Sequence, residues 1–407
     1  MEYGLLGEKL GHSFSPQIHE ALAGYRYQLL PTPPEAVEEL FRQRDFKGLN
    51  VTIPYKQTVI PLCGEVDPAA QAIGAVNTVV NRDGKLFGYN TDMDGLIYLA
   101  RRAGVAMEGK KVVILGSGGT SRTARAAALS MGAAETAVIS RRGEDNYENL
   151  SRHADTQVII NTTPVGMFPN CGVSPVDLDA FPRLEGVLDV VYNPLRTALL
   201  MEAEARQLPC SCGLPMLVAQ AKRAAELFTG TAIPDIRLEQ VIASLTAQVR
   251  NVILIGMPGC GKSTVGRLLA QRLGKEFLDL DQLIEEKAGK SIPEIFAQEG
   301  EAYFRALESQ AAKEAGARTG CVLSTGGGIA VRDENYLPLH QNGVIVHLKR
   351  DLDLLPKDGR PVSQRTSLHT LWAQRKPLYL SFADLTVENN RPVEETVNEI
   401  EEELNAL

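Results

Sequence analysis

The sequence predicts an α/β protein in which an N-terminal α/β domain is followed by two domains that each open with a strand, a glycine-rich loop and a helix. Two apolar, β-rich runs lead directly into such loops, KKVVILGSGGTSRTARAAAL from Lys110 and RNVILIGMPGCGKSTVGRLLAQRL from Arg250. A strand, loop and helix in this order form the first unit of a parallel α/β sheet. The length of 407 residues, at about 150 residues per domain, also favours more than one domain.

The composition excludes several classes of protein. Hydrophobic residues make up 44% of the chain and charged residues 23%, which argues against a disordered or fibrous protein. No run approaches the roughly 18 apolar residues of a membrane span, and the N-terminus lacks a basic region followed by an apolar stretch. The six cysteines show no zinc or redox spacing, and the net charge of −8 gives no general attraction to nucleic acid. We therefore expect a cytoplasmic protein with reduced thiols, in which any anionic ligand is bound by local clusters of residues.

The first part of the chain carries polar residues at the ends of apolar runs. Strand-like runs such as NVTI and AVNTVV alternate with amphipathic stretches such as PEAVEELFRQ. Lys56 follows a buried strand that stops at a proline, and Asn77 and Asp92 close two further apolar runs. Each has an ordinary structural interpretation as well, because a single lysine is usually solvated, and Ser15 followed by proline resembles a helix N-cap and first turn.

The first glycine loop, Gly116–Ser121, follows the strand VVIL, so its amides and a helix N-terminus can hold a pyrophosphate. We interpret this domain as Rossmann-like, although a tight turn that binds nothing would have the same pattern. The next strand ends at Ser140, Arg141 and Arg142, where NAD enzymes carry an acidic residue. Guanidinium groups suit a ribose 2′-phosphate, which favours NADP, unless the two arginines are simply solvated.

The second glycine loop, Gly256–Thr264, fits G-x-x-x-x-G-K-[ST] completely and lies between the strand VILI and the helical run VGRLLAQRL. Its amides are expected to hold phosphates. Lys262 is expected to neutralise the terminal phosphates, and the Ser263 hydroxyl to ligate Mg²⁺. The strand and helix context makes this P-loop the most specific signal in the sequence.

Further polar residues follow the P-loop. Asp279 and Asp281 lie two apart at a predicted strand end, so we expect them to project to the same face, where they can divide metal positioning and alcohol activation. Two solvated acids are the alternative. Three glycines, Gly326–Gly328, allow close approach of a ligand or form a plain flexible turn. Taken alone, Arg305, Arg360 and Arg375 would be surface arginines.

Nine motifs in the first part resemble shikimate 5-dehydrogenase over residues 1–247, in the order GHSFSP, NVTIPYK, GAVNT, YNTD, LGSGGTSRTA, SRR, INTTPVGM, DVVYNP and MLVAQA. The resemblance implies reduction of 3-dehydroshikimate to shikimate by NADPH. It implies that Ser13 and Ser15 hold the substrate carboxylate and that Lys56 and Asp92 form the catalytic pair. The expected contacts to the ring hydroxyls are Thr52, Asn77, Tyr192 and Gln220. The expected cofactor-binding residues are Gly116, Ser117, Gly118, Gly119, Thr120, Ser140, Arg141, Arg142 and Gly213.

Six later motifs resemble shikimate kinase across residues 250–407, in the order GMPGCGKST, FLDLD, FRALE, STGGG, DGRP and RKPLY. The resemblance implies phosphorylation of shikimate by ATP, with Asp279 contacting Mg²⁺ through water. It implies that Asp281 contacts the 3-hydroxyl that accepts the phosphoryl group and acts as the base for that hydroxyl. Arg305 and Arg375 would bind the substrate carboxylate, and Gly327 would pack on the ring. Arg360 would reach the transferring phosphoryl group from a lid. The expected nucleotide-binding residues are Gly259, Cys260, Gly261, Lys262, Ser263, Thr264 and Arg391.

The predicted lid departs from the kinase pattern. The segment LKRDLDLLPKDG before Arg360 is shorter than the usual lid and lacks the arginine expected just ahead of it. Arg391 can provide one face for the adenine, with Lys357 or Arg350 as weaker substitutes. A shorter lid is expected to raise the KM for ATP or to loosen the choice of nucleotide.

These observations predict a bifunctional enzyme that performs consecutive steps toward chorismate, in aromatic amino acid biosynthesis. The expected domains are a substrate domain over 1–98 and 213–247, an NADP domain over 99–212 and a kinase domain over 250–407, with no linker between the last two. Three alternatives remain: a first half that acts on quinate, a kinase for another small polyol, or one half that binds without turnover. Lys56, Asp92, Lys262, Ser263 and Asp281 argue against the third.

Overall fold

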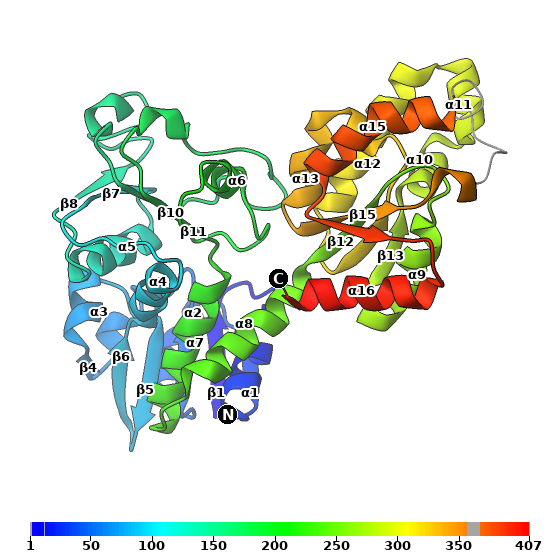
Figure 1. Cartoon of the computed structure of the whole chain (residues 1–407). Helices are drawn as coiled ribbons and strands as arrows, with labels where there is room; N and C mark the ends of the chain where they lie inside the picture. The colour runs from blue at the N-terminus through cyan, green and yellow to red at the C-terminus, as the bar shows by residue number, and fades with distance from the viewer. Residues whose placement is uncertain (1, 12, 356–366, 407) are drawn as a thin grey trace. The chain divides into compact units, whose positions relative to one another are not determined.

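The computed structural model describes residues 2–11, 13–355 and 367–406 (Figure 1). It contains three α/β sheets, which confirms the predicted fold class. The chain forms two compact units, Met1–Met167, Val173–Tyr192 and Leu199–Leu245 in the first, and Phe168–Gly172, Asn193–Ala198 and Thr246–Leu407 in the second. Within the described ranges, no helix is long and apolar enough to cross a membrane. The predicted residues Lys357 and Arg360 lie outside these ranges.

The first sheet is mixed, with strand order β2-β1-β3-β5-β6-β4. β5 is antiparallel to both β3 and β6, whereas β1 pairs in parallel with β2 and β3. Its core contains the buried side chains of Leu6, Phe41, Leu49 and Val79. The elements are β1 (Tyr3–Gly7), α1 (Ser15–Ala23), β2 (Tyr27–Pro31), α2 (Pro34–Gln43), β3 (Gly48–Val51), the 3-10 turn η1 (Ile60–Leu62), β4 (Glu65–Val66), α3 (Pro68–Ile73), β5 (Thr78–Arg82) and β6 (Lys85–Tyr89).

The second sheet is parallel, with strand order β11-β10-β9-β7-β8. Its central strands are buried on both faces, as expected for continuous apolar runs between helices. Gly116, after β7, has φ of 105°, a conformation that favours glycine. The elements are α4 (Thr91–Arg102), β7 (Lys111–Leu115), α5 (Gly119–Ser130), β8 (Glu135–Ile139), η2 (Leu150–His153), β9 (Val158–Asn161), η3 (Leu178–Ala180), β10 (Gly186–Asp189), α6 (Ala198–Ala205) and β11 (Cys210–Ser211).

Two helices follow this sheet, α7 (Leu214–Thr229) and α8 (Asp235–Val249). α7 packs closely on α4, because a Cβ on Gly95 would lie 2.7 Å from the carbonyl oxygen of Met216. It also returns to the first sheet, where Phe228 stacks on Tyr3 with ring centroids 5.2 Å apart. α7 therefore contacts elements from both parts of the first unit.

The third sheet is parallel, with strand order β13-β14-β12-β15-β16. Helices cover both of its faces (Figure 1), and β12, in the middle, is buried along its whole length. The elements are β12 (Asn251–Ile255), α9 (Lys262–Leu273), β13 (Glu276–Asp279), α10 (Leu280–Ala288), α11 (Ile292–Gln298), α12 (Glu301–Gly316), β14 (Cys321–Ser324), η4 (Ile329–Val331), η5 (Asp333–Asn335), α13 (Tyr336–His340), β15 (Gly343–Lys349), η6 (Leu352–Leu354), α15 (Leu368–Phe382), β16 (Leu385–Glu388) and α16 (Val393–Ala406).

Candidate active sites

The first unit contains a cavity of about 300 Å³. Polar residues from the first sheet, α1, α4 and α7 line it together with residues of the Rossmann-like part. The sequence-predicted residues on its walls are Ser13, Ser15, Thr52, Lys56, Asn77, Asp92, Thr120, Tyr192, Gly213 and Gln220. The structure thus brings together all eight predicted substrate-binding and catalytic residues of this half.

Lys56 and Asp92 form an ion pair in this cavity, with Lys56 Nζ 2.6 Å from Asp92 Oδ2. The side chains are 25% and 16% exposed, so the pair is shielded from bulk water but open to a ligand. Asp92 lies in the first turn of α4, where the helix dipole favours a negative charge. The carboxylate therefore holds an ammonium group at the cavity wall, where it can donate a proton to an oxygen of the ligand.

The Asn77 amide is held by a buried network. Its Oδ1 accepts a hydrogen bond from the backbone amide of Thr91 at 2.7 Å, and its Nδ2 donates to Thr91 Oγ1 at 3.1 Å. Asn50, on β3, extends the network, because its Nδ2 donates to Thr78 Oγ1 at 3.0 Å while its Oδ1 accepts from the Tyr27 hydroxyl at 2.8 Å. Asn50 is not among the predicted site residues, although an amide inside a buried strand is a usable signal.

The two serines lie next to one another at the start of α1. Ser13 Oγ donates to Ser15 Oγ at 3.1 Å and accepts from the backbone amide of Ser15 at 3.2 Å. The helix begins at Ser15 itself, with Phe14 in the cap position and no side-chain cap hydrogen bond. The interpretation of Ser15 as an N-cap is therefore wrong, and both hydroxyls belong to the cavity wall. Tyr192 adds a third hydroxyl to the cavity wall. Burial raises its pKa, so this hydroxyl is neutral.

The first glycine loop leads into α5, whose first residue is Gly119. A Cβ on Gly118 or Gly119 would meet open space, so the loop backbone is accessible to a ligand. Arg141 and Arg142 follow β8 and are exposed. A Cβ on Gly213 would lie 2.0 Å from the carbonyl oxygen of Val190, so glycine is required at the start of α7. The loop is therefore open, with two exposed guanidinium groups after the next strand, and its backbone amides are free to approach an anion.

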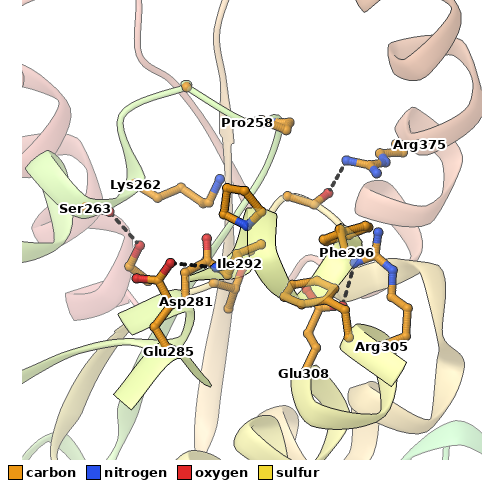
Figure 2. Close-up of a pocket in the computed structure, with 18 of the residues that line it drawn as sticks. Pro258, Lys262, Ser263, Asp281, Glu285, Ile292, Phe296, Arg305, Glu308 and Arg375 are labelled. Atoms are coloured by element: carbon orange, nitrogen blue, oxygen red, sulfur yellow. Dashed lines mark hydrogen bonds and ion pairs between the residues drawn. The ribbon is translucent and has the colours of Figure 1, made fainter. Parts of the chain in front are cut away.

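The second unit contains a cavity of about 520 Å³ around the P-loop (Figure 2). Figure 2 shows Lys262 and Asp281 at one end of the cavity and Arg305 and Arg375 at the other. The lining includes the predicted residues Gly259, Gly261, Lys262, Ser263, Thr264, Asp281, Arg305, Gly327 and Arg375. Cys260 is buried beneath the loop, and Asp279 contacts Ser263.

Lys262 and Ser263 occupy the positions that a P-loop requires. Lys262 is buried and its Nζ donates to the carbonyl oxygens of Gly256 and Met257 at 3.0 and 3.1 Å. Ser263 Oγ donates to Asp279 Oδ2 at 2.7 Å. Within the described ranges, no group of three or more His, Cys, Asp or Glu could hold a metal ion. A hydroxyl beside one carboxylate still fits Mg²⁺, which takes few protein ligands when phosphate oxygens supply others.

Asp281 does not lie on a strand. β13 ends at Asp279, and Asp281 is in the first turn of α10. The prediction that both carboxylates project from one strand face is therefore wrong: Asp279 Oδ1 accepts from the backbone amide of Asp281 at 3.1 Å and caps the helix. Asp281 Oδ1 is buried without a hydrogen-bond partner in the described part of the chain. Burial raises its pKa to about 6, although Lys262 opposes the shift.

Arg305 is held by carboxylates. It is 6% exposed, and its Nη1 lies 2.7 Å from Glu308 Oε2. Burial raises the pKa of Glu308 even though Arg305 opposes the shift. Sequence reasoning missed Glu308, three residues after Arg305 on α12, because a glutamate in a helix gives no signal of burial. The spacing of three is the usable clue, since residues i and i+3 are neighbours on a helix.

The glycine run after β14 is required by space rather than by flexibility. A Cβ on Gly326 would lie 2.7 Å from Glu308 Oε1 and 2.8 Å from Asp281 Oδ1. A Cβ on Gly328 would lie 2.0 Å from Arg305 Nη1. The carbonyl of Gly327 accepts from Arg375 Nη1 at 2.8 Å. The run therefore packs directly against the buried charges, and the interpretation as a plain flexible turn is wrong.

Two separate sites thus define the class of the protein: an oxidoreductase site beside a dinucleotide-binding loop, and a phosphotransferase site around a P-loop. Residues 5–79 match the family described as Shikimate dehydrogenase substrate binding domain, and residues 258–405 match the family described as Shikimate kinase. Shikimate dehydrogenase (NADP(+)) from Geobacillus kaustophilus is 38% identical over 268 residues, covering 59% of this chain and 96% of that protein.

Solved structures agree. A chorismate mutase/shikimate 5-dehydrogenase fusion protein from Clostridium acetobutylicum is 34% identical with a TM-score of 0.57, covering 60% of this chain and 96% of that one. Shikimate 5-dehydrogenase from Thermus thermophilus in complex with NADP(H) and shikimate is 32% identical with a TM-score of 0.54, covering 60% and 99%. The chain belongs to the shikimate dehydrogenase (NADP(+)) family and carries a shikimate kinase domain, both of the shikimate pathway.

Proposed function

We propose that the first unit reduces 3-dehydroshikimate to shikimate with NADPH, and that the second unit phosphorylates shikimate to shikimate 3-phosphate with ATP and Mg²⁺. One observation carries the proposal. In each unit the predicted catalytic residues line one cavity, Lys56 paired with Asp92 in the first and Asp281 near Lys262 in the second. The product of the first reaction carries the hydroxyl that the second consumes.

In the reduction, the residues of the chain bind the ring and deliver a proton. Ser13 and Ser15 offer neighbouring hydroxyls to the substrate carboxylate, and the fixed Asn77 amide meets a ring oxygen. NADPH supplies the hydride. As the ketone oxygen gains negative charge, the Lys56 ammonium stabilises it and donates a proton. Asp92 orients that ammonium, because its carboxylate is 2.6 Å away.

Arg141 and Arg142 are proposed to select NADPH over NADH. Exchange of both residues for serine should lower kcat/KM with NADPH at least about tenfold, because charge-assisted hydrogen bonds to a phosphate contribute about 1.5–3 kcal/mol. The value with NADH should change less than about twofold. Initial rates with each cofactor measure this. Arg152→Ser, at another exposed arginine of the same unit, is the control, and an equal loss with both cofactors would contradict the assignment.

In the phosphorylation, catalysis rests mainly on positioning and charge neutralisation. Arg305 and Arg375 are proposed to bind the shikimate carboxylate at one end of the cavity. The opposite end of the ring then faces Asp281, whose unpartnered oxygen can accept the proton of the attacking hydroxyl. ATP would supply the phosphoryl group, and Mg²⁺ would neutralise part of the phosphate charge. Lys262 and Ser263 would bind the phosphate oxygens, and Ser263 and Asp279, whose side chains are hydrogen-bonded at 2.7 Å, would hold the ion. Arg360, which lies outside the described residues, is proposed to bind the transferring phosphoryl group.

The decisive experiment is the mass of the products formed from 3-dehydroshikimate, NADPH, ATP and Mg²⁺ in one reaction. A mass of shikimate 3-phosphate supports both assignments. The variants Lys56→Ala and Asp281→Asn separate the halves: the first should leave the substrate untouched, and the second should accumulate shikimate. Preferred turnover of quinate in place of shikimate would contradict the substrate assignment of the first unit.

A further inference from the structure

Three cations lie at the carboxyl edge of the third sheet, on the side of β15 and β16. Lys349 Nζ pairs with Glu388 Oε1 at 2.6 Å, and Arg391 pairs with Glu399. Arg350 has no carboxylate partner among the described residues, and its Nε is buried there without a hydrogen-bond partner. Among these three cations, Arg350 therefore differs in having a charge that no carboxylate in the described ranges neutralises.

Arg350 lies beside the P-loop. It directly follows β15, which pairs in parallel with β12, the strand that leads into the loop. Arg350 Nη1 is 3.7 Å from the point that a Cβ on Gly261 would occupy. The amides around Gly261 open α9 and form the phosphate-binding part of the loop. The guanidinium group is thus within reach of an anion bound to those amides.

Asn389 fixes the loop at this position. Its Nδ2 donates to the carbonyl oxygen of Cys260 at 2.7 Å, and its Oδ1 accepts from Thr396 Oγ1 at 2.8 Å. Asn389 and Thr396 are both buried, so the bonds are protected from water. The backbone amide of Asn389 donates to the carbonyl oxygen of Lys349 at 2.7 Å. The segment that carries Arg350 and the loop residue that it approaches are therefore tied to the same asparagine.

The order of the strands indicates which phosphate of a bound nucleotide would lie near Arg350. Asp281 and Gly326 follow β13 and β14, on one side of β12, whereas Arg350 follows β15, on the other side. The acceptor hydroxyl faces Asp281, so Arg350 lies on the side away from the acceptor. A phosphate on that side stays with the nucleotide after transfer.

We propose that Arg350 binds a phosphate oxygen of the nucleotide that remains in the product diphosphate. A phosphate oxygen would satisfy the guanidinium group, and the planar fork suits phosphate geometry. The proposal rests on the proposed function, in which the P-loop binds ATP. It is separate from adenine stacking, because it predicts the same contribution whatever the base.

The test measures the dissociation constants of ADP and GDP by calorimetry on the full chain. Arg350→Gln should weaken both nucleotides at least about tenfold and by the same factor, since a hydrogen bond to a charged group is lost. Arg350→Lys, which keeps the charge, should recover part of the affinity. Lys349→Gln is the matched control, because it removes a neighbouring charge that already pairs with Glu388, and it should change affinity less than about twofold.

The outcomes distinguish a failure of the nucleotide assignment from a failure of the role of Arg350. If the unaltered chain binds neither ADP nor GDP, the nucleotide assignment of the P-loop fails, and the proposal for Arg350 fails with it. If the unaltered chain binds ADP and Arg350→Gln binds it within about twofold, only the role of Arg350 is overturned. A loss confined to one base, or an equal loss in Lys349→Gln, would also overturn it. Unchanged dehydrogenase activity and thermal unfolding show that the variants are folded.

Discussion

Replacing Lys56 by alanine should lower kcat for the reduction of 3-dehydroshikimate at least about 100-fold, within the roughly 10² to 10⁴ that a positioned general acid contributes. Lys56 Nζ lies 2.6 Å from Asp92 Oδ2 in a partly buried pair. The change removes the proton donor and leaves the Asp92 carboxylate without its partner. The absorbance of NADPH follows the reaction, and the values of kcat and KM are obtained separately.

Lys85→Ala provides the matched control. Lys85 also pairs with a carboxylate, Glu65, at 2.8 Å, but both side chains are more than half exposed, and such a surface pair contributes about 0–1 kcal/mol. Its kcat should equal that of the unaltered chain. Phosphorylation of added shikimate by the Lys56→Ala protein verifies that the second unit is intact. A variant with unchanged kcat and a raised KM would make Lys56 a binding residue instead.

Replacing Asp281 by asparagine should lower kcat for shikimate phosphorylation at least about 100-fold, because the amide cannot take the proton of the attacking hydroxyl. In the unaltered chain the pKa of Asp281 is about 6, and only the ionised carboxylate acts as a base. kcat/KM for shikimate should therefore fall about tenfold for each pH unit below pH 6 and level off above it. A coupled assay for ADP measures the rate, with dehydrogenase activity as the internal control. A flat profile from pH 5 to 8 would contradict the role.

The same substitution should raise thermal stability at pH 7. The Asp281 carboxyl has a higher pKa in the folded chain than its ordinary value of 3.8, so the folded state binds the proton more tightly. Protonation then favours folding, and this stabilisation is lost as the pH rises from about 4 through about 6. Above pH 6 the ionised, buried group destabilises the second unit, and a neutral amide does not. Calorimetric unfolding at pH 5 and 7 tests this, because the gain should be larger at pH 7.

The sequence predicted the sheets well, because apolar runs and glycine loops are local signals. The runs before Gly116 and Gly256 become β7 and β12, each buried inside a parallel sheet. The antiparallel pairing of β5 with β3 was not predicted. A strand in either direction has the same alternation of side chains, so the pairing direction is set by contacts distant in sequence.

Site residues that belong to sequence motifs were predicted. Site residues whose role depends on burial among distant partners were missed. The predicted residues Lys56 and Asp92 line the cavity of the first unit, and Lys262 and Asp281 line that of the second. Asn50 and Glu308 were missed, because their importance depends on partners from other elements, Thr78 and Arg305. A strand period predicts that Asp279 and Asp281 share a face, but α10 already begins at Leu280, so Asp281 lies in a helix. The residue at which a strand ends and a helix begins is the feature that sequence patterns locate least precisely.

The close approach at Gly213 has a consequence for motion within the first unit. The backbone amide of Gly213 donates to the carbonyl oxygen of Val191 at 2.9 Å, and a Cβ at Gly213 would lie 2.0 Å from the carbonyl oxygen of Val190. The chain after β10 carries Tyr192, and α7 carries Gln220, so both cavity residues are attached to this contact. This contact couples the two segments, so we expect Tyr192 and Gln220 to move together if the cavity opens or closes.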